Sequence, residues 1–171
     1  MSVSLVTKNC SLNISWKTYV TKINVHELGH IVLYVKDLQR SSEFYGEILG
    51  WKKLPRQADM PAQAFSSGRT HHELLLIEVG NMAAAKPDHL QLGLYHFGLK
   101  IGDTDDELLQ AIEFLQEKGV TITGTADHHV THSVYITDPD GNQIELYIDV
   151  ADANWREDES LIMQPTRRLD V

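Results

Sequence analysis

Residues 30–37 read HIVLYVKD, and residues 96–103 read HFGLKIGD. The two stretches lie 66 residues apart, and this offset aligns His30 with His96. Both stretches are rich in the β-branched and aromatic residues that favour strands. An internal duplication is the economical interpretation.

Each copy continues with the same order of predicted elements. A helical pattern follows the first strand, over residues 38–49 in one copy and 105–118 in the other. Strand-like runs follow each helix, at 51–54 and 71–79, and then at 120–123, 132–137 and 143–150. Each half is therefore expected to be a strand and a helix followed by two or three antiparallel strands.

The duplicated sequence stretches set the expected domain boundaries. Residues 25–150 form the predicted domain, and residues 81–91 form a loop that links its halves. Residues 1–24 lack a clear period and are interpreted as an N-terminal arm, whereas residues 151–171 are a C-terminal tail. The strand signal is weakest over residues 55–69.

The length and composition fit one domain with a single hydrophobic core. The chain has 171 residues, 42% of them hydrophobic, which is enough for one core. Its net charge of -9 disfavours nucleic acid, and no apolar run is long enough for a membrane span or a signal peptide, so we expect a cytoplasmic protein. The single cysteine, Cys10, excludes an internal disulfide and a zinc-thiolate cluster.

Histidine is the unusual component, with nine residues in the chain. Because side chains alternate along a strand, His30 and His96 each face away from the apolar stripe of their own strand. These stripes, which should pack under the helices, are Ile31, Leu33 and Val35, and Phe97, Leu99 and Ile101. A lone strand histidine is usually just hydrogen-bonded, but the equivalence of these two favours a shared cleft between the halves.

A third element is a hairpin near the end of the second half. Residues 138–142 read DPDGN, a strong turn signal between two strand-like runs. Tyr135 and Glu145 are equidistant from Asp140, so we expect them opposite each other on one sheet face. Glu145 in a core strand is costly unless it is exposed, paired or bound to a metal.

Two imidazoles and a carboxylate form a site that suits a divalent metal. His30, His96 and Glu145 together would suit Fe(II), Mn(II), Ni(II) or Zn(II), with positions left open for substrate and oxygen. No residue here can itself perform dioxygen chemistry, so a metal would have to do it.

These motifs together resemble the vicinal oxygen chelate superfamily, which includes glyoxalase I, bleomycin-resistance proteins and extradiol catechol dioxygenases. The resemblance covers residues 26–150 and implies an α+β fold. It also implies two tandem βαβββ modules, about 26–80 and 93–150, that form a curved mixed sheet around a metal-binding cleft. By this resemblance the metal ligands are His30, His96 and Glu145.

The sequence THHELL at residues 70–75 resembles the paired-histidine strand of extradiol dioxygenases, which implies that His72 assists oxygen activation and proton transfer. Tyr135 matches their active-site tyrosine, and His128 lies near their further histidine. The resemblance thus implies an Fe(II)-dependent ring-cleaving dioxygenase in aromatic compound catabolism, acting on a catecholic or related vicinal diol with dioxygen. It is compatible with a homodimer.

Two other functions stay open within the same superfamily. A glyoxalase-like lyase or isomerase with Mn(II), Ni(II) or Zn(II) would need a fourth, carboxylate ligand; Leu75 falls at that position, with Glu73 and Glu78 close by. The second open function is that of a metal-free, non-catalytic binding protein of the bleomycin-resistance type.

Residues 26–30, HELGH, match the H-E-x-x-H signature of zinc metalloproteases. That motif works only on a helix, where the two histidines share a face. Here Gly29 interrupts the turn and a strand follows at once. We therefore interpret His26 and Glu27 as exposed residues that approach the strand.

Overall fold

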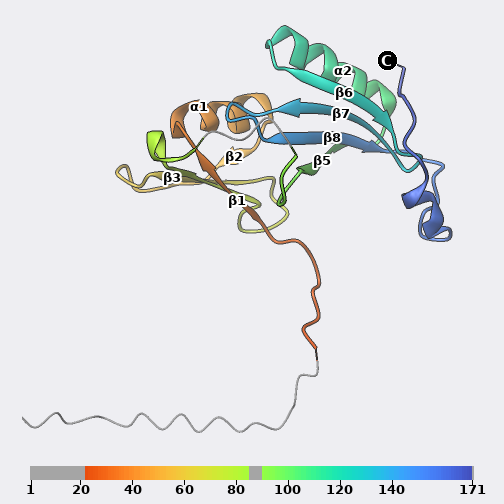
Figure 1. Cartoon of the computed structure of the whole chain (residues 1–171), viewed down its shortest axis with the longest axis horizontal. Coiled ribbons are helices and arrows are strands. Elements are labelled where there is room, and N and C mark those ends of the chain that lie inside the picture. Colours follow the sequence, from red (N-terminus) through yellow and green to blue (C-terminus); the bar gives the residue numbers. More distant parts are fainter. Residues whose placement is uncertain (1–21, 85–89, 171) are drawn as a thin grey trace, which may run out of the picture.

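The computed structural model describes residues 22–84 and 90–170, which form two modules with the same order of elements (Figure 1). The first module contains β1 (Ile31–Val35), α1 (Leu38–Glu43), a π-helical turn (Phe44–Ile48), β2 (Lys52–Lys53), β3 (Ala62–Ser66) and β4 (Leu74–Glu78). The second contains β5 (His96–Gly102), α2 (Asp105–Glu117), β6 (Ile122–Asp127), β7 (Thr131–Thr137) and β8 (Gln143–Asp149). Short 3-10 helices are formed by Gly80–Met82 and Glu159–Met163.

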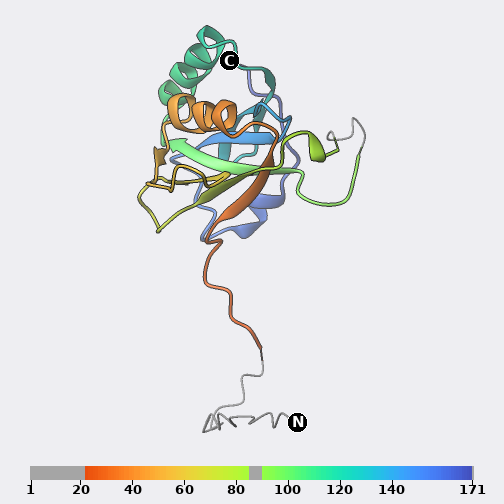
Figure 2. The same ribbon diagram turned by 90° about the vertical axis from the view of Figure 1, so that its left-hand side faces the viewer.

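Each module builds its own four-stranded mixed sheet. The strand orders are β1-β4-β3-β2 and β5-β8-β7-β6, and in each sheet only the first pair is parallel. Figure 2 shows α1 and α2 on the same side of the two sheets. The predicted α+β fold of tandem βαβββ modules is confirmed, with the curved sheet divided by its hydrogen bonding into two.

The strand periodicity explains which faces are buried. In β1, Leu33 and Val35 are buried whereas Val32 and Tyr34 are exposed, as the alternation predicts. In β5, Phe97 is buried, but Ile101 is 37% exposed. The predicted inward position of Ile101 is therefore wrong, because the pairing with β8 shifts register between Lys100 and Gly102.

The helices begin where side chains cap them. Asp37 accepts a hydrogen bond from the backbone N–H of Arg40 at the start of α1, and Thr104 forms a reciprocal capping box with Glu107 at the start of α2. The single helix predicted over 38–49 becomes π-helical after Glu43. Gly50, which follows it, has a φ of 73°.

A buried hydrogen bond joins the first module to the β7–β8 turn of the second. The Tyr45 hydroxyl donates to Asp138 Oδ2 at 2.8 Å, and both residues are buried. Asp138 Oδ1 accepts from the backbone N–H groups of Asp140 and Asn142. Asp140 in turn accepts from the backbone N–H of Lys36. Hydrogen bonds within the DPDGN turn therefore fix its conformation, and the bonds to Tyr45 and Lys36 hold the turn against the first module.

The C-terminal tail lies along the free edge of the second sheet. Asp127 and Arg167 form an isolated antiparallel bridge, and Thr125 Oγ1 donates to the carbonyl of Leu169. Most of the predicted N-terminal arm lies outside the described residues, and residues 22–30 extend away from the helices without regular structure (Figure 2). Every helix within 22–84 and 90–170 is too short or too polar to cross a membrane.

Candidate functional site

Two predicted metal ligands meet on the second module. His96 at the start of β5 places Nε2 3.3 Å from Glu145 Oε2 on β8. The side chains are 28% and 15% exposed, so both remain accessible from the sheet face. Gly98 is the register partner of Glu145, and a Cβ atom there would lie 3.4 Å from Glu145 Oε2. The absence of a side chain at Gly98 leaves room for the carboxylate.

The second oxygen of the same carboxylate is held by two hydroxyl groups on β7. Glu145 Oε1 accepts from Ser133 Oγ at 2.7 Å and from the Tyr135 hydroxyl at 3.2 Å. Burial, followed by the Glu145 charge, raises the pKa of Tyr135 above its ordinary value. The phenol therefore stays protonated and able to donate.

Ser133 was not among the predicted site residues, although a usable signal exists in the sequence. It lies two residues before Tyr135 and so on the same face of the strand. Ser133 is also fully buried. A small hydroxyl on the strand face that carries Tyr135, opposite the strand of Glu145, is the pattern that could have found it.

His128 extends this network beyond the sheet. Its Nε2 lies 2.7 Å from the Tyr135 hydroxyl, and its Nδ1 lies 3.2 Å from Thr166 Oγ1 in the tail. The turn that places it is held by Asp127, whose side chain accepts from the backbone N–H of His129. The structure thus brings together four of the six predicted site residues, namely His96, His128, Tyr135 and Glu145.

The other two, His30 and His72, lie together on the first module. Their ring centroids are 4.6 Å apart, and His71 packs against His72. Burial, with smaller contributions from the nearby His71 and His30, lowers the pKa of His72 below its ordinary value. The His72 imidazole is thus neutral at pH 7 and can accept a proton.

The predicted triad is consequently divided between the modules. Within the described ranges, no three His, Cys, Asp or Glu side chains are arranged to hold a metal ion. The pair of His96 and Glu145 nevertheless fits a shared cation: ligand atoms about 2.0–2.2 Å from a metal, at angles near 100°, lie roughly 3.2 Å from each other, close to the observed 3.3 Å. A second imidazole would complete the two-histidine, one-carboxylate set typical of Fe(II) oxygenases.

The sheet register identifies the first-module counterpart of Glu145. Leu75 pairs with Val32 in the same way that Glu145 pairs with Gly98. The two nearby carboxylates are engaged elsewhere. Glu73 accepts from the backbone N–H groups of Ser67 and Thr70, and Glu78 accepts from the backbone N–H of Leu38 at 2.7 Å. Leu75 thus stands at the position where the family resemblance would place a fourth, carboxylate ligand.

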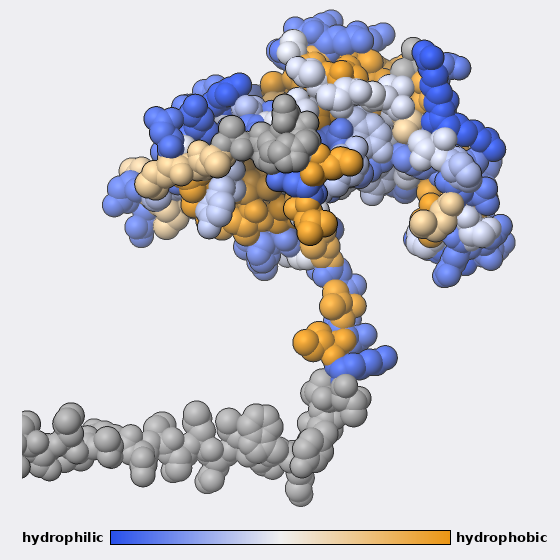
Figure 3. Space-filling model, viewed as in Figure 1, coloured by the Kyte–Doolittle hydropathy of each residue, from blue (hydrophilic) through white to orange (hydrophobic). Residues whose placement is uncertain are grey.

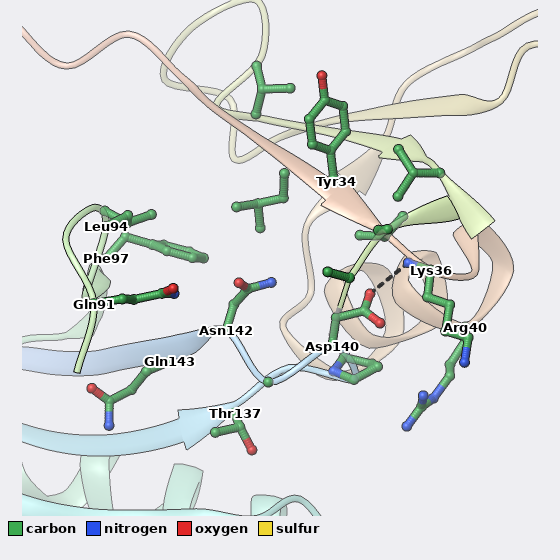
Figure 4. Close-up of a pocket in the computed structure, with 18 of the residues that line it drawn as sticks. Tyr34, Lys36, Arg40, Gln91, Leu94, Phe97, Thr137, Asp140, Asn142 and Gln143 are labelled. Carbon is green, nitrogen blue, oxygen red and sulfur yellow. Dashed lines mark hydrogen bonds between the residues drawn. The ribbon is translucent and has the colours of Figure 1, made fainter. Parts of the chain in front are cut away.

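A separate cleft of about 1460 Å³ lies between the modules, beside the β7–β8 turn (Figure 4). Tyr34, Lys36 and Arg40 line it from the first module, and Phe97 and Gln143 from the second (Figure 4). None of the six predicted site residues is among the side chains that line it. The six predicted site residues therefore lie outside this cleft, although Gln143, the register partner of His96, lines it.

Apolar side chains are exposed on the strand and the segment that adjoin both clusters. On β1, Val32 is 45% and Tyr34 71% exposed. In the segment before β5, Leu92 is fully exposed, and Leu94 and Tyr95 are more than half exposed. Figure 3 shows hydrophobic residues over the first sheet and along residues 22–30. Such a concentration beside a site is typical of an interaction surface.

The H-E-x-x-H stretch at residues 26–30 is not helical. His26 and His30 therefore do not share a helical face, and both are exposed. The interpretation of this stretch as the approach to a strand is confirmed.

The family model "Glyoxalase/Bleomycin resistance protein/Dioxygenase superfamily" matches residues 27–146. A catechol-2,3-dioxygenase from Bacillus subtilis (strain 168) is 34% identical over 152 residues, which are 86% of this chain but only 52% of that protein. A lactoylglutathione lyase from Escherichia coli O157:H7 is 30% identical over 126 residues, covering 70% of this chain and 90% of the lyase. A glyoxalase/dioxygenase structure from Nostoc punctiforme shares the fold, with a TM-score of 0.59 and 23% identity over 86% of this chain and 99% of that one.

Proposed function

Because this chain belongs to the glyoxalase/bleomycin resistance protein/dioxygenase superfamily, we propose that it is an Fe(II)-dependent, extradiol-type ring-cleaving dioxygenase. Its substrate would be a catecholic or related vicinal diol, with dioxygen as the second substrate. The observation that carries the proposal is Leu75 at the register position of Glu145, since it limits the site to two imidazoles and one carboxylate. The name of the Bacillus relative, of which the chain spans about half, supports the same reaction.

His30, His96 and Glu145 would hold the metal, which when bound supplies the redox chemistry that joins a diol to dioxygen. Tyr135 remains protonated and donates to a substrate oxygen. The neutral His72 imidazole takes up a proton and returns it to the oxygen derived from dioxygen. His128, whose Nε2 contacts the Tyr135 hydroxyl, aids proton movement on that side.

A homodimer would supply the missing connection between the clusters. The ligands are divided between the two modules, and exposed apolar side chains flank both groups. In a two-fold dimer, His30 of one copy can join His96 and Glu145 of the other, and the same contact buries Val32, Tyr34 and Leu94. The proposed dimer therefore completes two equivalent sites at once.

The second candidate is a metal-dependent lyase or isomerase. It is favoured by the Escherichia coli lactoylglutathione lyase, because the chain covers 90% of that protein, and it is opposed by Leu75.

The third candidate is a protein that binds a small molecule without a metal and without catalysing a reaction. Cytoplasmic location and a role in aromatic catabolism stay predictions.

Metal analysis combined with an oxygen assay separates these functions. The purified protein is loaded with Fe(II) under anaerobic conditions, and oxygen uptake is measured with a panel of catechols. Oxygen uptake and a ring-fission chromophore support the dioxygenase. Activity without oxygen in the Ni(II)- or Zn(II)-loaded protein supports the lyase, and ligand affinity that His30→Ala does not change supports the binding protein.

A further inference from the structure

The second module contains two buried polar atoms that lack a partner. Among the side chains that the structure describes, only His96 Nδ1 and Gln143 Oε1 are buried without a hydrogen bond. They belong to residues that pair in register, His96 on β5 and Gln143 on β8. Register partners in adjacent strands project from the same face of the sheet, so the two side chains are neighbours.

The two unpartnered atoms are chemically complementary. A neutral imidazole carries its proton on one nitrogen and a lone pair on the other. His96 Nε2 lies 3.3 Å from Glu145 Oε2, so a cation bound between them would take the Nε2 lone pair and leave the imidazole proton on Nδ1. Gln143 Oε1 is an acceptor and can receive that proton. Buried polar groups in folded proteins are nearly always paired.

The first module does not repeat this arrangement. The residue that corresponds to Gln143 is Glu73, which precedes the pair formed by Ile31 and Leu74. Its carboxylate is already occupied by the Ser67 and Thr70 backbone N–H groups. A free acceptor therefore stands beside the ligand histidine only in the second module.

We propose that Gln143 is a positioning residue for His96. When the cation is bound, a rotation of the Gln143 amide would bring Oε1 onto the Nδ1–H group of His96 and fix the imidazole ring with its Nε2 lone pair on the cation. Gln143 acts through His96 and is not itself a metal ligand. The inference deepens the proposed function, because it assigns a residue that prepares His96 to bind the cation.

The Nδ1–H proton of His96 in the Zn(II)-loaded protein tests this directly. Protein labelled with ¹⁵N in histidine is studied by ¹H–¹⁵N correlation, and a His96→Asn variant identifies the signals of His96. We expect a slowly exchanging Nδ1–H in the wild type and in Gln143→Glu, which keeps an acceptor. In Gln143→Leu this proton should exchange with water at a much higher rate. Thr137→Val is the matched control, since Thr137 pairs with Gln143 from β7, and it should leave the exchange rate unchanged.

Cobalt(II) titration provides the second measurement. Gln143→Leu should bind Co(II) about 10- to 100-fold more weakly, the usual cost of losing the partner of a ligand histidine, whereas Gln143→Glu should restore the affinity. A rapidly exchanging Nδ1–H in the Zn(II)-loaded wild type, or a folded Gln143→Leu variant with unchanged exchange and unchanged Co(II) affinity, overturns the role of Gln143 alone. A wild type that binds neither metal overturns the proposed function and the role of Gln143 with it.

Discussion

Leu75 lies in the first module at the position that Glu145 holds in the second. Leu75 pairs with Val32 and Glu145 with Gly98, and the duplicated stretches place Val32 and Gly98 at equivalent positions. The two halves have thus kept the same backbone register while differing in one donor group. A three-ligand site keeps coordination positions open for a diol and for oxygen, whereas a fourth carboxylate would close one of them.

Restoring a carboxylate at this position should change the metal preference. In Leu75→Glu we expect roughly tenfold tighter binding of Zn(II), the order that one group of a metal site contributes, together with loss of oxygen uptake. The neutral isostere Leu75→Gln should do neither. Competition titration with a chromophoric chelator measures the affinity. Equal affinities in the two variants would show that Leu75 does not lie at the metal site.

Gly98 should be required for the position of Glu145. A Cβ atom at residue 98 would lie 3.4 Å from Glu145 Oε2 and 3.3 Å from Tyr147 Cε1, so we expect Gly98→Ala to shift the ring and the carboxylate by a few tenths of an ångström. We expect weaker Co(II) binding with a free energy of unfolding within about 1 kcal/mol of the wild type. Gly124→Ala in β6 is the control, because a Cβ atom there meets nothing within 4 Å. Co(II) affinity that falls equally in both variants would contradict this steric explanation.

Tyr45→Phe should lower the free energy of unfolding by removing a contact between the modules, without changing the site residues. The variant loses a hydrogen bond to the buried Asp138, which costs about 1.5–3 kcal/mol because the acceptor is charged. Asp138 retains its other donors, so the turn persists. Urea unfolding measures the loss, and Tyr34→Phe, on an exposed residue, should be neutral.

The same bond predicts a dependence on alkaline pH. Burial and Asp138 raise the pKa of Tyr45 in the folded state well above the ordinary value of 10.0. The unfolded chain therefore ionises first, so the contribution of Tyr45 is complete below pH 10 and decreases as the pH rises further. The stability difference between wild type and Tyr45→Phe should become smaller above pH 10. A stability difference between the two proteins that stays constant up to pH 11 would contradict the raised pKa of Tyr45 in the folded state.

Sequence periodicity predicted most of the fold because both strands that carry histidines are half-buried. Leu33 and Val35 alternate with exposed residues in β1, and the DPDGN turn fixes the register of Tyr135 opposite Glu145. The site on the second module follows from this register. His128 was predicted from the resemblance alone; the structure places its Nε2 2.7 Å from the Tyr135 hydroxyl, and its role stays a prediction.

The remaining features depend on tertiary contacts that one sequence does not reveal. The strand predicted from residue 71 begins only at Leu74, because Glu73 is bound by the preceding turn. The weak stretch 55–69 contains β3, whose strand character derives from its pairing with β4. No periodicity indicates that Thr166 contacts His128, and none indicates how the clusters around His30 and His96 would meet.

The division of the ligands predicts complementation between inactive variants. His30→Ala and Glu145→Gln should each abolish metal binding by the dimer, because each removes one ligand from both sites. In a mixed dimer, one site lacks both residues, whereas the other takes His30 from the Glu145→Gln copy and Glu145 from the His30→Ala copy. An equal mixture after subunit exchange should therefore regain about one quarter of the wild-type sites.

Mixing experiments also distinguish the dimer from closure of the two modules within a single chain. If each chain builds its own site, every copy in the mixture still lacks one ligand, and no Co(II) binding returns. The double variant His30→Ala/Glu145→Gln mixed with wild type is the control, because its mixed dimers contain no complete shared site. Sedimentation velocity of Tyr34→Asp completes the test: a charge on the exposed apolar face of β1 should shift the protein toward monomer and weaken Co(II) binding in parallel. A monomeric wild type that binds Co(II) through His30, His96 and Glu145 would overturn the shared site.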